Sequence, residues 1–161
     1  MAQCDMYLKI DGIDGESEDA KHKNEIQIDS YSLGAANSGS SVMGSGSGTG
    51  KVQFQDFSFQ KVVDKSSPAL AKYCANGKHI TTTVLTVRKA GENPQEYLII
   101  TMTESIVSSY QHSGHNGGGL PLESVTLNFS KIKYDYKPQQ KDGTLGALVT
   151  MTADLKTNTF T

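Results

Sequence analysis

The chain has no tryptophan, only two cysteines and four prolines among its 161 residues, and no marked excess of charge of either sign. Its formal net charge is −2, so it lacks the surplus of lysine and arginine with which nucleic-acid binders contact phosphates. Its apolar runs, such as residues 97–102, are too short to span a membrane. Residues 1–9 show no basic region followed by an apolar stretch, as a secretory signal would. We therefore expect a protein that is made in the cytosol and binds neither nucleic acid nor membrane.

The two cysteines, Cys4 and Cys74, can form at most one disulfide bond. Cys74 falls among apolar residues near the C-terminal end of a predicted helix, where the helix dipole disfavours a thiolate. We interpret both as reduced cytosolic thiols and neither as a nucleophile. A chain of 161 residues can bury a core without metals or disulfides, so residues 1–161 are expected to form one domain.

Most of the chain shows the period-two alternation of half-buried β-strands, as in Met6, Leu8 and Ile10. Similar runs cover residues 26–33, 52–59, 81–88, 96–110, 123–136 and 147–155. The apolar phase slips by one residue at positions 55–56 and again beyond Ser130, and such slips are typical of bulges that curl a sheet toward a barrel. We predict a mainly β fold of about seven to nine antiparallel strands, arranged as a small β-barrel or a sandwich.

One short helix is predicted just before position 77. Ser67 suits the N-cap and Pro68 suits the first helical position. Leu70, Tyr73 and Cys74 follow at helical spacing as one apolar stripe, and Gly77 ends the helix. This helix is expected to flank the barrel.

Residues 34–50 contain six glycines and five serines. A segment of this composition cannot offset the entropy of its own ordering, so it is either a mobile surface loop or an arm that orders against a neighbouring subunit. Val42 and Met43 are its only large apolar residues and would anchor such an arm.

No catalytic or metal site is predicted. His112 and His115 could supply two metal ligands, but they lie beside a glycine cluster and lack a fixed third ligand, although Glu104 and Glu123 are on neighbouring strands. The glycine-rich stretch 44–50 leads into a strand rather than a helix, so it is not a phosphate cradle. We expect no cofactor and no enzyme; a hydrolase would require a metal at the two histidines.

An acidic and then basic stretch contains Glu16, Glu18, Asp19, Lys21 and Lys23. Such a stretch is usually a solvated turn. In a self-assembling protein, however, opposite charges on one loop can pair with a second copy and so close rings or extend tubes. We name these residues, with Val42 and Met43, as candidates for a subunit interface.

Several segments along nearly the whole chain resemble the Hcp family, the tube proteins of bacterial type VI secretion. They are residues 6–12, 15–23, 50–56, 63–68, 77–80, 85–91, 96–102 and 123–138. The resemblance implies a small β-barrel with one flanking helix, assembled into hexameric rings that stack into a tube. It also implies export through the type VI apparatus without a cleaved signal peptide, with effectors, a spike protein and a sheath as partners.

The resemblance further implies that effectors are held in the lumen of the ring. If the second strand lines this lumen, Ser30 and Ser32 are the candidate contacts, because small hydroxyls leave room for cargo and bind it weakly. Relatives often carry tryptophan in this strand, where Tyr31 and Leu33 stand here. The alternative function is a stand-alone, lectin-like β-barrel, although its tyrosines and phenylalanines would then be expected on loops. A phage-type tail tube is a close cousin of the leading interpretation.

Overall fold

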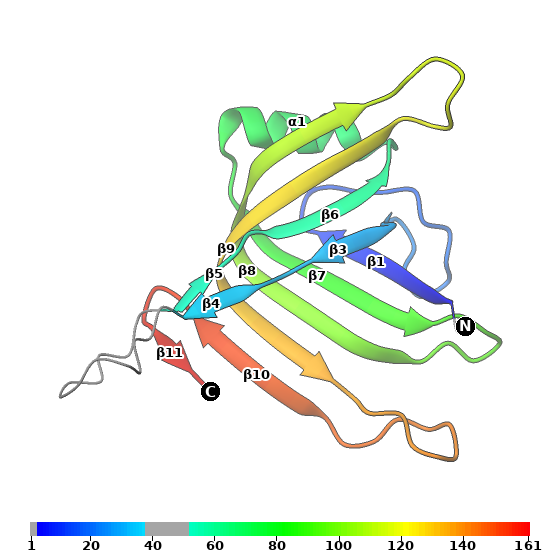
Figure 1. Cartoon of the computed structure of the whole chain (residues 1–161), viewed down its shortest axis with the longest axis vertical. Helices are drawn as coiled ribbons and strands as arrows, with labels where there is room; N and C mark the ends of the chain where they lie inside the picture. The colour runs from blue at the N-terminus through cyan, green and yellow to red at the C-terminus, as the bar shows by residue number, and fades with distance from the viewer. Residues whose placement is uncertain (1–2, 38–51) are drawn as a thin grey trace.

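The computed structural model describes residues 3–37 and 52–161, which contain eleven strands and one helix (Figure 1). The elements are β1 Cys4–Ile10, β2 Ile26–Gln27, β3 Ser30–Ser32, β4 Ala35–Asn37, β5 Val52–Phe54, β6 Phe57–Val62, α1 Ser67–Asn76, β7 Ile80–Lys89, β8 Glu96–Ser113, β9 Leu122–Tyr136, β10 Val149–Asp154 and β11 Thr159–Phe160. Strands β4 and β5 form a separate ribbon, and the other nine strands form one antiparallel sheet.

The long hairpin of β8 and β9 organises this sheet. Along one edge, β8 continues through β7 and β1 to β2. The free edge of β9 is used twice, because residues 122–127 pair with β6 and residues 131–136 pair with β10. Strand β6 then pairs with β3, so the sheet divides at β9. We call β3, β6 and residues 122–127 of β9, with the part of β8 paired to them, the upper wall. We call β10, β11 and residues 131–136 of β9, with the part of β8 paired to them, the lower extension.

The segment of residues 26–32 joins the two margins of the curled sheet. Its β2 part pairs with β1, and its β3 part pairs with β6. Between them, the amide of Ile28 donates to the carbonyl of Met6, and the amide of Asp29 donates to the carbonyl of Gln60. The molecule is therefore barrel-like. Its two margins are joined because the first part of this short segment pairs with β1 and the second part pairs with β6.

The hairpin bends where the apolar phase of β9 was predicted to slip. The pairing of β8 with β9 skips Glu104 and Ser130, and Glu104 has a positive φ of 53°. The register itself shifts farther along, between Val107 and Ser109. Such irregularities bend a strand, so they curl the sheet as the sequence indicated.

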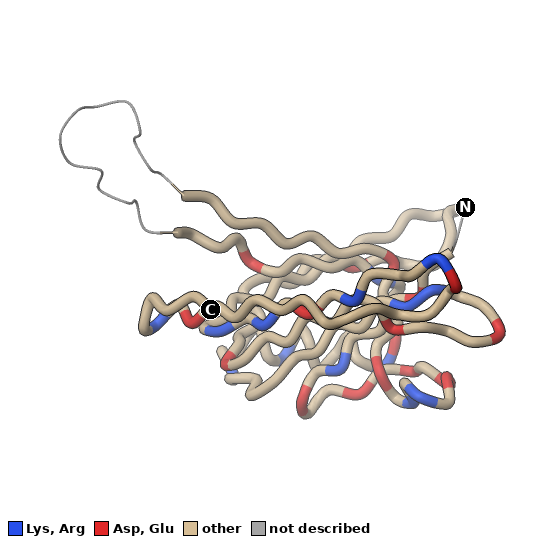
Figure 2. Tube along the Cα trace, turned by 90° about the horizontal axis from the view of Figure 1, so that it is seen from below, with Lys and Arg blue, Asp and Glu red and all other residues tan. Residues whose placement is uncertain are grey.

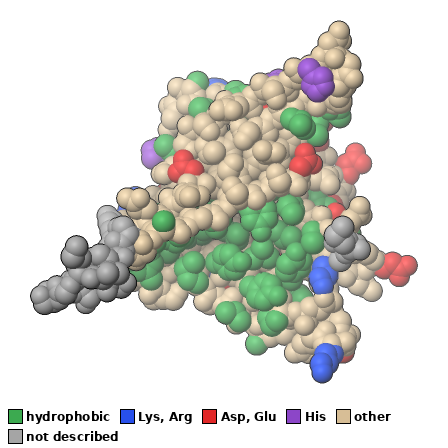
Figure 3. Space-filling model, viewed as in Figure 1, with side chains coloured by type: hydrophobic (Ala, Val, Ile, Leu, Met, Phe, Trp, Pro, Cys, Tyr) green, Lys and Arg blue, Asp and Glu red, His purple; other side chains and the backbone are tan. Residues whose placement is uncertain are grey.

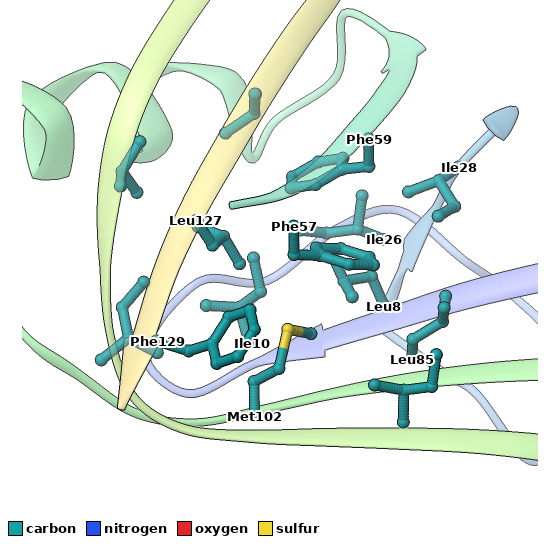
Figure 4. Close-up of a cluster of buried hydrophobic side chains, with 14 of the residues drawn as sticks. Leu8, Ile10, Ile26, Ile28, Phe57, Phe59, Leu85, Met102, Leu127 and Phe129 are labelled. Carbon is teal, nitrogen blue, oxygen red and sulfur yellow. The ribbon is translucent and has the colours of Figure 1, made fainter. Parts of the chain in front are cut away.

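The core lies between the upper wall and strands β1, β7 and β8. Phe57 and Phe59 of β6 point toward Leu8, Leu85 and other fully buried side chains (Figure 4). The helix α1 lies beside the upper ends of β8 and β9 and buries Leu70 and Tyr73 (Figure 1). Burying each such side chain contributes about 1.5–3 kcal/mol.

The helix starts differently from the prediction. Its N-cap is Ser66, which makes no side-chain capping bond, and Ser67 is already helical. The side chain of Asp64 instead accepts the Ser66 amide at 2.8 Å, while the Ser67 hydroxyl bonds to Glu123. The predicted stop is confirmed, since Gly77 is left-handed and its amide donates to the carbonyl of Tyr73.

Other differences concern short strands. The predicted second strand, residues 26–33, is divided into β2 and β3, and β11 was not predicted. The predicted loop of residues 34–50 begins later than expected, because β4 extends from Ala35 to Asn37. The single helix found in the two described stretches has ten residues, too few to cross a membrane.

Candidate functional site

The lower extension of the sheet carries an apolar surface that continues directly from the core. Neighbouring positions on paired strands share one face, and here Ile100 is opposite Tyr134, which is opposite Met151. In the next row, Leu98, Tyr136 and Val149 are similarly aligned. Both β8 members of these rows are buried, but their β9 and β10 neighbours are not. Their exposed fractions are 38% for Tyr134, 41% for Tyr136, 62% for Val149 and 37% for Met151.

We call these four residues the open apolar face. They are exposed because β6 leaves β9 after Leu127, so the upper wall covers β8 but not β10. With Thr150, they line a shallow hollow. In Figure 3 the hydrophobic side chains gather on the lower strands, below β3 and β4. A contiguous apolar patch of this kind typically marks a surface that binds another protein.

Two further tyrosines border this face. Tyr97 shares a 3.3 Å hydrogen bond with the thiol of Cys4, and its ring stands edge-on to Tyr136 at 6.4 Å. That hydrogen bond, followed by burial, raises the pKa of Tyr97 to about 12. Burial also raises the pKa of Tyr31, on β3. Both phenols therefore stay neutral around pH 7, and this border adds no charge to the open apolar face.

The upper wall presents a different uncharged surface on its outer side. Its phenylalanines point inward, so alternate residues of β3, β6, β9 and β8 point outward in two rows. One row is Ser30, Gln60, Ser124 and Gln111, and the other is Ser32, Ser58, Thr126 and Ser109. We call these eight residues the hydroxyl wall, since six of them carry a hydroxyl and none carries a charge.

Hydrogen bonds order one end of the hydroxyl wall. Thr126 bonds to Ser109 at 2.6 Å and to Ser108 at 2.7 Å. The Ser108 hydroxyl and the Asn128 amide group both donate to Asp56, at 2.6 and 2.9 Å. In Figure 3 the wall belongs to the largely uncharged band above the hydrophobic side chains. The eight residues of the wall carry no charge themselves, and the carboxylate of Asp56 lies at this end.

A family model described as "Type VI secretion system effector, Hcp" matches residues 7–136. The chain is also 49% identical over 140 residues to Protein hcp1 of Pseudomonas aeruginosa, covering 86% of each protein. The chain belongs to the Hcp family. As an Hcp protein it is a tube subunit of the type VI secretion system, which is the function that the sequence predicted. The matches give no support to the lectin-like alternative.

Solved Hcp structures have the same fold. The crystal structure of Hcp1 from Salmonella typhimurium is 43% identical, covers all of both chains and superposes with a TM-score of 0.83. A structure described as a type six secretion system protein is 31% identical, covers 99% of this chain and all of its own, and has a TM-score of 0.93. The predicted mainly β, barrel-like fold with one helix is confirmed.

The two lumen candidates of this Hcp chain, Ser30 and Ser32, are both exposed on β3. The other six members of the hydroxyl wall were not predicted. The alternation of Val125, Leu127 and Phe129 does place Ser124 and Thr126 on the outer side of their strand. Which strands lie beside β3, however, depends on pairing between segments far apart in the sequence.

The predicted interface residues on the charged loop, residues 13–25, have different surroundings. Glu18, Lys21 and Lys23 are exposed. Asp19 points back to β7, where Arg88 donates to it, and this bond lowers the pKa of Asp19. Glu16 accepts the amide of Lys65 at 3.1 Å. Charged residues of both signs are interspersed along the trace, without separation into one acidic and one basic side (Figure 2). Val42 and Met43 lie outside the described residues.

Glu123 is engaged in a buried ionic cluster behind the hydroxyl wall. It forms an ion pair with Lys61, and both side chains are fully buried. It also accepts hydrogen bonds from Ser67 at 2.8 Å and from Tyr110 at 2.6 Å. Burial, together with the bond to Glu123, raises the pKa of Tyr110 to about 12. The cluster therefore ties the start of α1 to β6, β8 and β9, and Glu123 is not free to bind a metal beside His112.

The other candidate ligands are not brought together. His112 and His115 are both exposed, and Glu104 forms an ion pair with Lys156. Over residues 3–37 and 52–161, no group of three or more His, Cys, Asp or Glu side chains could hold a metal ion. Cys4 and Cys74 are both free, and Cys74 packs against the core.

Proposed function

We propose that six copies of this Hcp chain form a ring through the open apolar face, and that such rings stack into the secretion tube. The observation that carries the proposal is the unbroken row from the buried Ile100 through Tyr134 to the exposed Met151. Apolar side chains continue past the limit of the subunit's own core, so a neighbouring subunit would complete that core. A head-to-tail contact of this kind closes a ring when its rotation is a simple fraction of a turn.

We further propose that the hydroxyl wall, including Ser30 and Ser32, lines the lumen. A cargo protein must be held during assembly and released on delivery. A neutral wall of short hydroxyls can form many weak hydrogen bonds, and it neither attracts nor repels cargo by charge. The function is then binding and assembly without turnover, with type VI effectors as cargo and the spike and sheath as further partners.

This function fits a protein made in the bacterial cytoplasm and exported through the type VI apparatus itself. The charged loop offers Glu18, Lys21 and Lys23 to a neighbouring subunit or ring. Pairs of exposed charges contribute little energy, about 0–1 kcal/mol each. Their expected role is therefore to fix the orientation of subunits that the apolar contacts hold together.

Native mass by light scattering, with electron microscopy of the same sample, tests the ring. The unmodified chain should elute as a hexamer with a central hole. The Met151→Glu variant should elute as a folded monomer, because burying an unpaired carboxylate costs more than the contact gains. The matched control is Thr152→Glu, which adds the same charge to the other face of β10, beside Lys133. A monomeric unmodified chain, or a hexameric Met151→Glu variant, would disprove this assembly.

A further inference from the structure

His22 is enclosed between two carboxylates. Its side chain is on the charged loop and only 6% of the residue is exposed. Its Nδ1 lies 2.7 Å from Glu25 Oε2, within the loop, and its Nε2 lies 2.8 Å from Glu96 Oε1, at the start of β8. Both ring nitrogens are thus at hydrogen-bond distance from acceptors that cannot donate when ionised.

The protonation state of the ring decides how many of these bonds can exist. An imidazolium donates from both nitrogens, whereas a neutral imidazole donates from only one. In the neutral state, the unprotonated nitrogen directs its lone pair at a carboxylate oxygen less than 3 Å away. Histidine is the side chain that ordinarily changes charge between pH 5 and 8. The second bond therefore exists only when the imidazole is protonated on both nitrogens.

Aromatic and charged side chains from two strands lie around His22. The Tyr7 ring of β1 stacks on it at 4.6 Å, and Arg88 of β7 lies against Tyr7, with 4.8 Å from guanidinium to ring centroid. Arg88 is paired with Asp19 of the loop and with Asp5 of β1. Two carboxylates thus face the Arg88 guanidinium, and two others face the His22 imidazole.

Of the two bonds, the one to Glu96 is the easier to lose. The Glu96 side chain is 33% exposed, so water can replace the imidazole, whereas the Glu25 side chain is 12% exposed. Glu25 also lies three residues from His22 in the same loop, so their bond joins two parts of the loop and does not attach the loop to a strand. The Glu96 bond joins the loop to β8, and its loss leaves the Arg88–Asp19 pair and the stacking of His22 on Tyr7 as side-chain contacts between this part of the loop and the strands.

We propose that His22 is a pH-operated latch for the charged loop. At low pH, the imidazolium bridges Glu25 and Glu96 and fastens the loop to the start of β8. As the pH rises through the titration of His22, the ring gives up one proton, the Glu96 bond breaks, and residues 18–24 loosen from the sheet. The stabilisation of the loop is complete on the acid side and decreases toward the alkaline side.

Hydrogen exchange at the imidazole C2 position, followed by mass spectrometry on the full-length chain, measures the titration of each histidine. The exposed His79, His112 and His115 serve as internal references. Glu96→Gln should change the pH dependence of exchange at His22 relative to the reference histidines, because it replaces an ionised neighbour at hydrogen-bond distance by a neutral one. The matched control, Glu92→Gln, removes an exposed carboxylate from the same hairpin and should leave the His22 titration unchanged. An unaltered His22 titration in Glu96→Gln would overturn the latch.

Backbone amide exchange of the loop provides the second readout. The amides of Gly15 and Asn24 donate to the carbonyls of Asn24 and Ser17, respectively. As the pH rises from 5 to 8, their exchange rates should increase by more than the intrinsic pH dependence of amide exchange. In His22→Gln, which has no proton to lose, this additional pH dependence should disappear. The same pH dependence in His22→Gln would refute the proposal. Neither measurement requires the hexamer, so failure of the latch and failure of the hexamer are separate results.

Discussion

The hydroxyl wall and the open apolar face lie on the same long strand, β9, on either side of Ser130. Before Ser130, the even-numbered residues Ser124 and Thr126 point outward, away from the core. After it, the even-numbered residues Tyr134 and Tyr136 point toward the core side of the sheet. Neither set of residues carries a charge, but the side chains of the first can hydrogen-bond to water and those of the second are mainly apolar. An unpaired residue in each strand of the hairpin, Glu104 and Ser130, thus places two kinds of surface side by side.

The largest expected effect comes from removing the support behind the hydroxyl wall. Lys61→Met leaves Glu123 buried without its counter-charge, and such a change typically costs about 3–5 kcal/mol in the free energy of unfolding. Urea denaturation of the subunit measures this. Lys131→Met, at an exposed position on β9, is the control and should change stability by less than about 0.5 kcal/mol. Equal effects of the two substitutions would show that the ionic cluster does not support the wall.

The next effect comes from making the apolar face resemble the hydroxyl wall. Replacing Val149 and Met151 together by serine removes about 3 kcal/mol of apolar burial from each subunit contact. The association constant should fall on the order of a hundredfold per contact, while the unfolding of the isolated subunit should change little. Sedimentation over a range of concentrations measures the dissociation. If the rings were as stable as before, the contact would have to lie elsewhere.

A smaller effect is expected from altering the wall itself. Ser32→Gln adds bulk to β3 without adding charge, so it should leave both stability and native mass unchanged. Retention of a cargo effector should fall several-fold, because the longer side chain fills the space beside Ser58. Co-purification of a type VI effector with the ring measures the loss. Unchanged retention together with an intact ring would remove Ser32 from the lumen assignment.

The smallest effect concerns the two tyrosines whose pKa is raised to about 12. Tyr97 borders the apolar face, and Tyr110 lies behind the wall. Because an unfolded tyrosine titrates near 10, each phenol contributes stability that is complete below pH 10 and decreases as the pH rises toward 12. Replacing either residue by phenylalanine should flatten the decline of the free energy of unfolding over this range. An unchanged slope between pH 10 and 12 in both variants would contradict these assignments.

The sequence predicted the architecture because alternation and bulges are local signals. The slip beyond Ser130 and the left-handed Gly77 were recognised from neighbouring residues alone. The helix start was misplaced because Ser67 bonds to Glu123, a residue 56 positions away that no local pattern connects to it. Hydrogen bonding across such a distance depends on tertiary structure.

The candidate surfaces were only partly predictable for the same reason. Val149 and Met151 alternate like core residues, and the sequence does not reveal that β6 ends its pairing before it could cover them. Ser30 and Ser32 were singled out through the family resemblance. Their partners in the hydroxyl wall follow from the register of four strands, which chain order does not specify.

The segment of residues 26–32, which joins β1 to β6, has a kinetic consequence. Strands β7, β8 and β9 are connected as successive hairpins, so they can pair early with little loss of chain entropy. The joining segment gains its bonds only when both margins are in place, because Ile28 donates to Met6 and Asp29 donates to Gln60. Closure is therefore expected to be the last step of subunit folding, and the first to reverse when the subunit is pulled apart.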